Sequence, residues 1–165
     1  MRRKTNAHRP KAAPENKSRA VAAIFLTVAF VLIVCVVARG IPTYGQSKVV
    51  DLTSLRLEVA DTDASRTLGL SGRDSLDSGA GMLFTFDAPG IYPFWMKDMK
   101  FPLDMVWIDS GKVVDVVTLR PPVPGELIPP SHIPIANANL VLEINAGKAA
   151  DLGLVKGTYV ILPAR

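Results

Sequence analysis

Hydrophobic residues are distributed along this chain in two different ways. Residues 20–38 form an unbroken run of 19 positions without a charge, which at about 1.5 Å per residue spans the roughly 30 Å hydrocarbon core of a bilayer. From about Val49 onward, hydrophobic residues come instead in short runs, some alternating with polar residues and bounded by turn residues, a pattern typical of β-strands. The pattern therefore predicts one transmembrane helix followed by a mainly β domain.

The β-type runs can be placed individually. Strands are expected over residues 55–59, 81–86, 103–108, 113–119, 140–144 and 158–162. Two short helices are expected over residues 64–68, with Asp61 or Thr62 as N-cap, and over residues 149–152. Because strands recur at short spacing and helices are few, we predict a compact β-sandwich of jelly-roll type or a partly open barrel.

Residues 103–119 are expected to form a β-hairpin around the sequence DSGK. If Ser110 and Gly111 are its two-residue loop, Asp104 faces Val117 and Asp115 faces Val106. Both carboxylates then lie on the same face of the hairpin. A longer loop would shift the register and separate the two aspartates.

The setting of Asp104 is the unusual feature of this hairpin. Both faces of the hairpin are otherwise largely apolar, so it should lie centrally in the sheet. A carboxylate there costs several kcal/mol unless a cation or metal balances it. Lys97 and Lys100 are the nearest cations in the sequence.

The net charge of +4 is unevenly distributed. Residues 1–19 contain seven basic residues and one acidic residue, a net of +6, whereas the rest of the chain contains 12 basic and 14 acidic residues, a net of −2. The basic character belongs to the tail, so a nucleic-acid-binding domain is not indicated. By the positive-inside rule, the N-terminus lies in the cytoplasm and the β domain lies outside, in the periplasm or the extracellular space.

We therefore expect a single-pass protein of the inner or plasma membrane. Its predicted segments are a basic cytoplasmic tail (1–19), a transmembrane signal-anchor helix (20–38), a linker (39–48) and an extracytoplasmic β domain (49–165). A cleaved signal peptide is the alternative, because Val36 and Ala38 suit a cleavage site, although signal-peptide hydrophobic regions usually run about 7–15 residues. Cys35, the only cysteine, lies inside the hydrophobic run, so the β domain folds without disulfides.

Four ordered motifs in the β domain resemble a known family. They are RTLGLSGR (66–73), GMLFTF (81–86), FWMK (94–97) with PLD (102–104), and VLEINAG (141–147). Over residues 55–162 the chain resembles the domain-of-unknown-function 192 family. The resemblance implies a compact, mostly β domain of sandwich or jelly-roll type, often exported in prokaryotes behind a signal or anchor. It implies no activity. The chain departs from the family pattern at Ser71, usually Met, and at Asp98-Met99, usually Asn-Thr.

The resemblance points to five candidate ligand-binding residues, which are Arg73, Trp95, Lys97, Asp104 and Glu143. They comprise two cations and two carboxylates beside an aromatic ring that can stack on a sugar or another ring. The alternative is a structural network of salt bridges that fixes the register of the sheet. Four methionines are expected to fill gaps in the core, at positions 82, 96, 99 and 105.

Residues 120–134 contain six prolines. Such a segment is stiff and extended, and it cannot be a central strand. It either covers a sheet edge or acts as a lid, which would place Glu126 and His132 near the candidate cluster.

The remaining sequence supplies no complete catalytic constellation. His132 is the only histidine outside the tail, so a histidine-based metal cage is excluded and we expect no metal or other cofactor. The favoured function is a binding module for a small polar ligand or an envelope glycan. A scaffold for another envelope protein is the alternative, and an enzyme such as a hydrolase is the third candidate.

Overall fold

The computed structural model of this chain describes residues 47–163. The predicted tail and transmembrane helix, and most of the predicted linker, lie outside the described residues. Within residues 47–163, no helix is both long enough and apolar enough to cross a membrane.

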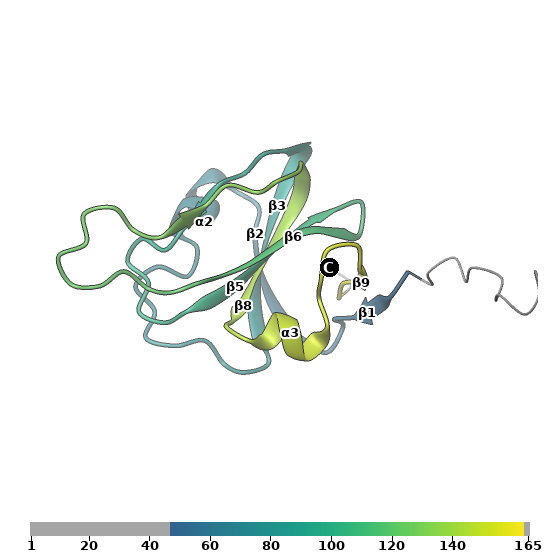
Figure 1. The fold of residues 1–165 in the computed structure, drawn as a ribbon, viewed down its shortest axis with the longest axis horizontal. Helices are drawn as coiled ribbons and strands as arrows, with labels where there is room; N and C mark the ends of the chain where they lie inside the picture. The colour runs from purple at the N-terminus through teal and green to yellow at the C-terminus, as the bar shows by residue number, and fades with distance from the viewer. Residues whose placement is uncertain (1–46, 164–165) are drawn as a thin grey trace, which may run out of the picture. The chain divides into compact units, whose positions relative to one another are not determined.

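The described residues form a mainly β domain with two short helices (Figure 1). In chain order its elements are β1 (Val49–Asp51), β2 (Arg56–Ala60), α2 (Asp63–Leu68), β3 (Ala80–Gly90), β4 (Phe94–Trp95), β5 (Leu103–Asp109), β6 (Lys112–Leu119), β7 (Ser131–His132), β8 (Ala138–Asn145), α3 (Lys148–Leu152) and β9 (Tyr159–Ile161). Seven strands make one sheet in the order β1-β9-β6-β5-β8-β3-β2, which curls into a half-barrel, and β4 pairs with β7. Of the two predicted architectures, the structure has the partly open barrel.

Strand β5 is the fourth of the seven strands, and both of its faces are buried. Val106 and Ile108 pack into a core shared with α3, whereas Met105 and Trp107 pack into a second core on the opposite face. Burial on both faces explains why the sequence of this strand is an almost continuous run of apolar residues. The predicted central position of the hairpin is confirmed.

The β5–β6 hairpin follows the predicted register only beside its turn. There Ile108 pairs with Val113, as the predicted two-residue loop requires. A β-bulge then occurs between Trp107 and Ile108, and it leaves Val114 of β6 as the extra residue. Every pairing beyond the bulge is shifted by one position.

The shift separates the two aspartates of the hairpin. Asp104 faces Thr118 rather than Val117, and Asp115 faces Trp107 rather than Val106. Because neighbouring residues of a strand point to opposite faces, Asp104 and Asp115 lie on opposite sides of the sheet. The prediction that they share one face is therefore wrong.

Helix α2 begins and ends where the sequence indicates. Thr62 is its N-cap, and its hydroxyl accepts a hydrogen bond from the Ser65 backbone at 3.1 Å while the Ser65 hydroxyl accepts one from the Thr62 backbone at 2.9 Å. Gly69 ends the helix with a φ of 51°. Arg66 then fastens the helix to β3, because its guanidinium donates to the Thr85 carbonyl at 2.7 Å.

The proline-rich segment connects β6 to β8 and extends to the left in Figure 1. It contains the short strand β7, which pairs with β4 through Phe94 with His132 and Trp95 with Ser131. The Met96 backbone also donates to the Pro130 carbonyl at 2.8 Å. This segment therefore braces β4.

Candidate functional site

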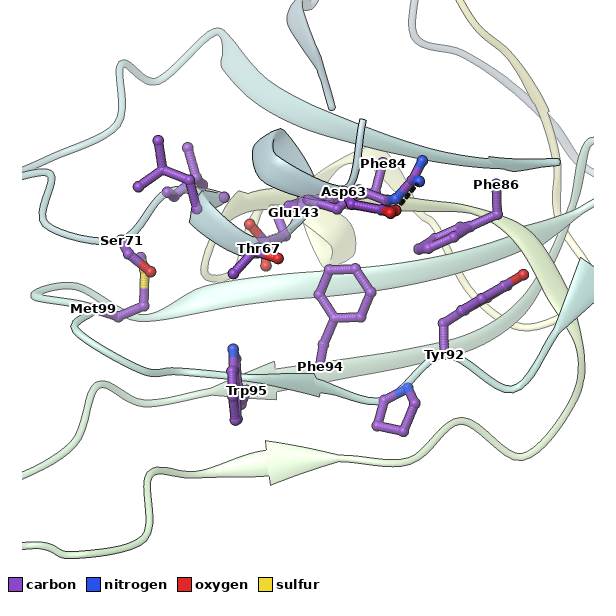
Figure 2. Close-up of a pocket in the computed structure, with 15 residues that line it drawn as sticks. Asp63, Thr67, Ser71, Phe84, Phe86, Tyr92, Phe94, Trp95, Met99 and Glu143 are labelled. Atoms are coloured by element: carbon purple, nitrogen blue, oxygen red, sulfur yellow. Dashed lines mark hydrogen bonds and ion pairs between the residues drawn. The ribbon is translucent and has the colours of Figure 1, made fainter. Parts of the chain in front are cut away.

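A pocket of about 370 Å³ opens between helix α2, strand β3 and the segment leading into β4 (Figure 2). Its walls are mainly aromatic, formed by Phe84, Phe86, Tyr92, Phe94 and Trp95. Side chains of α2 complete one side, and Glu143 of β8 contributes the buried carboxyl group. The pocket is large enough for a small organic molecule.

The aromatic walls are packed against one another. Phe86 and Tyr92 stack with ring centroids 3.6 Å apart, and Phe94 meets Phe84 edge to face at 4.8 Å. Trp95 lies at the mouth, where 56% of its surface is exposed. A ligand would therefore meet a preformed set of rings.

Glu143 is the unusual residue of this pocket. Its neighbours across the sheet are Met82 of β3 and Met105 of β5, and only 4% of its surface is exposed. Within the described part of the chain, no group hydrogen-bonds to its carboxyl. Burial raises the pKa of Glu143 to about 8, because desolvation disfavours the charged form. The carboxyl group is therefore mostly protonated at neutral pH.

The basic residue of the pocket, Arg66, is held by other partners. Its guanidinium binds the Asp63 carboxylate at 2.7 Å and the Asp61 carbonyl at 2.8 Å, and it lies 5.3 Å from the centre of the Phe86 ring. These contacts, together with the one to β3, occupy Arg66. It does not neutralise Glu143.

A second hollow of about 470 Å³ adjoins the pocket and shares five lining residues with it, which are Asp63, Thr67, Leu68, Ser71 and Trp95. Lys97 lines this hollow, with its ammonium nitrogen 5.8 Å from the centre of the Trp95 ring. The Ser71 hydroxyl donates to the Lys97 carbonyl at 2.9 Å, and the Gly72 backbone donates to the Asp98 carbonyl at 2.9 Å. Ser71 and Asp98, two positions at which the sequence differs from the family pattern, thus link the segment after α2 to the segment after β4.

The structure brings only some of the predicted site residues together. Trp95 and Glu143 line the same pocket, and Lys97 lies on the outer side of Trp95. Arg73 instead forms a two-point ion pair with Glu58, with N–O distances of 2.6 and 2.7 Å. It lines neither hollow.

Asp104 lies on the opposite face of the sheet, where it is only 2% exposed. The predicted apolar setting is confirmed, but no lysine among residues 47–163 forms an ion pair with the carboxylate. Its oxygens accept hydrogen bonds from the Thr118 hydroxyl at 2.6 Å and from the Ala149 backbone at 2.8 Å, which fastens the first turn of α3. Lys100, an expected partner, binds Asp74 at 2.6 Å.

Sequence reasoning did not find most of the aromatic wall. The sequence pattern places Phe84 and Phe86 in a strand without a role at a site, it does not single out Tyr92, and it includes Arg66 only as part of a motif. The available signal was the density of aromatic residues in FTF (84–86) and YPFW (92–95). The four expected methionines are all buried, which confirms their role in the core. Among residues 47–163, no group of three potential metal ligands is found.

Comparisons with known proteins agree with this fold. The model of a family described as an uncharacterized ACR, DUF192, matches residues 46–162. A protein of unknown function from Novosphingobium aromaticivorans is 32% identical, with a TM-score of 0.55 over 62% of this chain and 71% of that one. A putative transcription regulator from Sinorhizobium meliloti is also 32% identical, with a TM-score of 0.53 over 62% of this chain and 78% of that one. No curated protein gives a significant match.

Proposed function

Since this chain belongs to the DUF192 family, which is described only as uncharacterized, we propose its function from the geometry: residues 47–163 form a binding module for a small molecule. The ligand occupies the pocket between α2 and β4. The predicted anchor at residues 20–38 holds this module at the outer surface of the membrane, where envelope glycans and small solutes are the available ligands.

The exposed ring of Trp95 carries this proposal. A tryptophan with 56% of its surface in solvent is held in a two-stranded pairing with β7 at the mouth of an aromatic pocket. A fixed, exposed indole offers a flat surface on which a sugar or another ring can stack. The nearby Phe94 and Tyr92 extend that surface inward. This arrangement supports a binding role.

Trp95 also provides the readout for a test. The chain has two tryptophans, of which Trp107 is fully buried, so quenching of fluorescence by iodide should come mainly from Trp95. The purified protein would be screened with glycan fragments and small solutes by fluorescence quenching and thermal unfolding. A ligand present at 100 times its dissociation constant adds about 2.7 kcal/mol of stability. We expect a ligand that protects Trp95 from iodide and raises the melting temperature.

Tyr159 offers a matched control for the Trp95→Ala variant. It is also a partly exposed aromatic residue with a lysine above its ring, since Lys112 lies 5.6 Å from the ring centre, but it lies in β9 and lines neither hollow. Trp95→Ala should abolish the ligand-induced rise in melting temperature, and Tyr159→Ala should preserve it. Equal loss in both variants, or no response to any solute, would contradict the proposed function.

A scaffold for an envelope protein is the second candidate function. The proline-rich segment and the residues after it expose several large apolar side chains, which are Val123, Leu127, Ile128, Ile133 and Ile135. Leu127 is 97% exposed and Ile128 is 79% exposed. Exposed apolar groups of this kind suit a protein contact. Crosslinking in intact cells should then recover a protein partner, and Leu127→Asp should abolish its capture.

A further inference from the structure

We infer that the ligand of the aromatic pocket carries an organic ammonium group, for which the Glu143 carboxylate is the counter-ion. This inference rests on the proposed binding function and narrows it to one chemical class. The inference rests on the position of a buried carboxyl group beside a wall of aromatic faces. This carboxyl group has no hydrogen-bond partner within residues 47–163.

The first observation is the isolation of the carboxyl. Glu143 is 96% shielded from solvent, since only 4% of its surface is exposed, yet it lines the pocket and has no hydrogen-bond partner within residues 47–163. A buried polar group without a partner is costly. Asp104, on the other face of the same sheet, has two donors. The missing partner of Glu143 can therefore come from a ligand that enters the pocket.

The second observation is the composition of the walls. The face of an aromatic ring attracts an organic cation, and aromatic cages with a carboxylate are suited to substituted ammonium groups. The structure already contains such a contact, because the Arg66 guanidinium lies 5.3 Å from the centre of the Phe86 ring. Phe94 faces the pocket, and among the described residues no cation lies over its ring, whereas Lys97 already lies 5.8 Å from the centre of the Trp95 ring. An ammonium group would meet these rings and Glu143 together.

The third observation is the charge balance around Glu143. On helix α2, Asp63 and Arg66 form an ion pair and cancel each other. Tyr92 faces the pocket from the segment before β4, while Lys97 and Asp98 line the adjoining hollow and are not among the residues that line the pocket. The facing positions on β3 and β5 are Met82 and Met105, which carry no charge. Ionised Glu143 would therefore be an uncompensated negative charge, which favours a cation.

This arrangement also predicts how binding depends on pH. Burial raises the pKa of Glu143 to about 8, so near pH 7 the free pocket is mostly neutral and must release a proton when it binds a cation. Affinity for an ammonium ligand should rise roughly tenfold per pH unit from pH 6 toward pH 8 and then level off. A neutral ligand that accepts a hydrogen bond from protonated Glu143 would show the opposite trend.

Choline and its neutral isostere 3,3-dimethylbutan-1-ol provide matched probes, because they differ essentially in the charge of one atom. Their dissociation constants for the full-length protein would be measured at pH 6, 7, 8 and 9 by NMR titration, followed at the indole signal of Trp95. At pH 9 we expect choline to bind at least about tenfold more tightly than the isostere, a difference of about 1.4 kcal/mol. At pH 6 the two should bind almost equally.

Glu143→Gln tests the assigned residue, and Glu126→Gln is its control. Glutamine keeps the size of the protonated glutamate but cannot ionise. Glu126 lies in the proline-rich segment, bound to Arg120, and lines neither hollow. Glu143→Gln should remove both the preference for choline and its pH dependence, whereas Glu126→Gln should retain both.

Four results separate this inference from the proposed function. Equal binding of the two probes at pH 9 overturns the ammonium assignment and leaves the pocket as a site for neutral ligands. An unchanged preference for choline in Glu143→Gln overturns the assignment of Glu143 as the counter-ion. Failure of both probes, together with binding of a glycan that depends on Trp95, also overturns the ammonium assignment alone. Failure of both probes and of every other solute overturns the binding function as well.

Discussion

Asp104 of β5 and Glu143 of β8 lie on adjacent strands of the sheet but point to opposite faces. Asp104 pairs with Ile144, whereas Glu143 pairs with Met105, so the one-residue offset places the two carboxyl groups on opposite sides. Asp104 accepts hydrogen bonds from the Thr118 hydroxyl and the Ala149 backbone. Glu143 faces the aromatic pocket. One carboxyl therefore supports the fold and the other is available to a ligand.

Replacement of Asp104 should destabilise the domain without affecting the pocket. Asp104→Ala removes the acceptor for two donors, and a buried donor left unsatisfied costs about 1–3 kcal/mol. We expect the free energy of unfolding, measured with urea, to fall by about 2–4 kcal/mol. Thr118→Val, which removes only one of the two hydrogen bonds, should cost about 1 kcal/mol. Loss of ligand binding in a folded Asp104→Asn variant would contradict this assignment.

Glu143 should make the domain less stable as the pH rises. Burial raises the pKa of Glu143 to about 8 from its ordinary value of 4.5, so the protonated form is favoured in the folded state. The stability that protonated Glu143 contributes to the folded domain is fully present below about pH 4.5. It is lost progressively as the pH rises to about 8. The loss can reach about 1.4 kcal/mol per pH unit in that window.

Glu143→Gln provides the comparison for this pH dependence. Urea unfolding of both proteins at several values between pH 5 and pH 9 should give a smaller slope for the variant. Above pH 8 the variant should be the more stable protein, because it has no buried charge to desolvate. Parallel curves for the two proteins would show that Glu143 ionises freely in the folded domain.

The ion pair between Arg73 and Glu58 should make only a small contribution to stability. The hydrogen bond from Arg73 lowers the pKa of Glu58, and the one to Glu58 raises the pKa of Arg73. However, 36% of the Arg73 side chain and 54% of the Glu58 side chain are exposed to screening water. A double-mutant cycle with Arg73→Ala and Glu58→Ala should give a coupling of about 1 kcal/mol or less. Ligand binding at the pocket should not change.

Asp115 should hold the end of the proline-rich segment in place. Burial by itself raises the pKa of Asp115, but hydrogen bonds from His132, Ile135 and Val116 together outweigh it and lower the pKa. The stabilisation is therefore present above about pH 4 and is lost as the pH falls through the lowered value. Hydrogen exchange, corrected for intrinsic rates, should show loss of protection at the Ile135 amide in Asp115→Ala at neutral pH. Protection retained there would contradict the role of Asp115 as the acceptor that holds the Ile135 amide.

Much of the secondary structure was predictable because its causes are local. Thr62 caps α2 through a residue three positions away, and the apolar run of β5 follows from burial on both faces. The two-residue turn of the β5–β6 hairpin also determined the register of the strand pairs next to it. The bulge at Val114 was not predictable from the hairpin sequence, because β5 is paired on its other side with β8 and all seven strands must curl together.

The sequence by itself determined the succession of short strands, the two short helices and the residue types available for a site. Only the tertiary structure decided which of those residues meet. Arg66, Trp95 and Glu143 come from three distant parts of the chain, and they meet at one pocket because α2, β4 and β8 converge there. Each side of a strand faces a different environment, so the pairing register alone separated Asp104 from that pocket. Register and convergence depend on long-range packing, which local patterns do not specify.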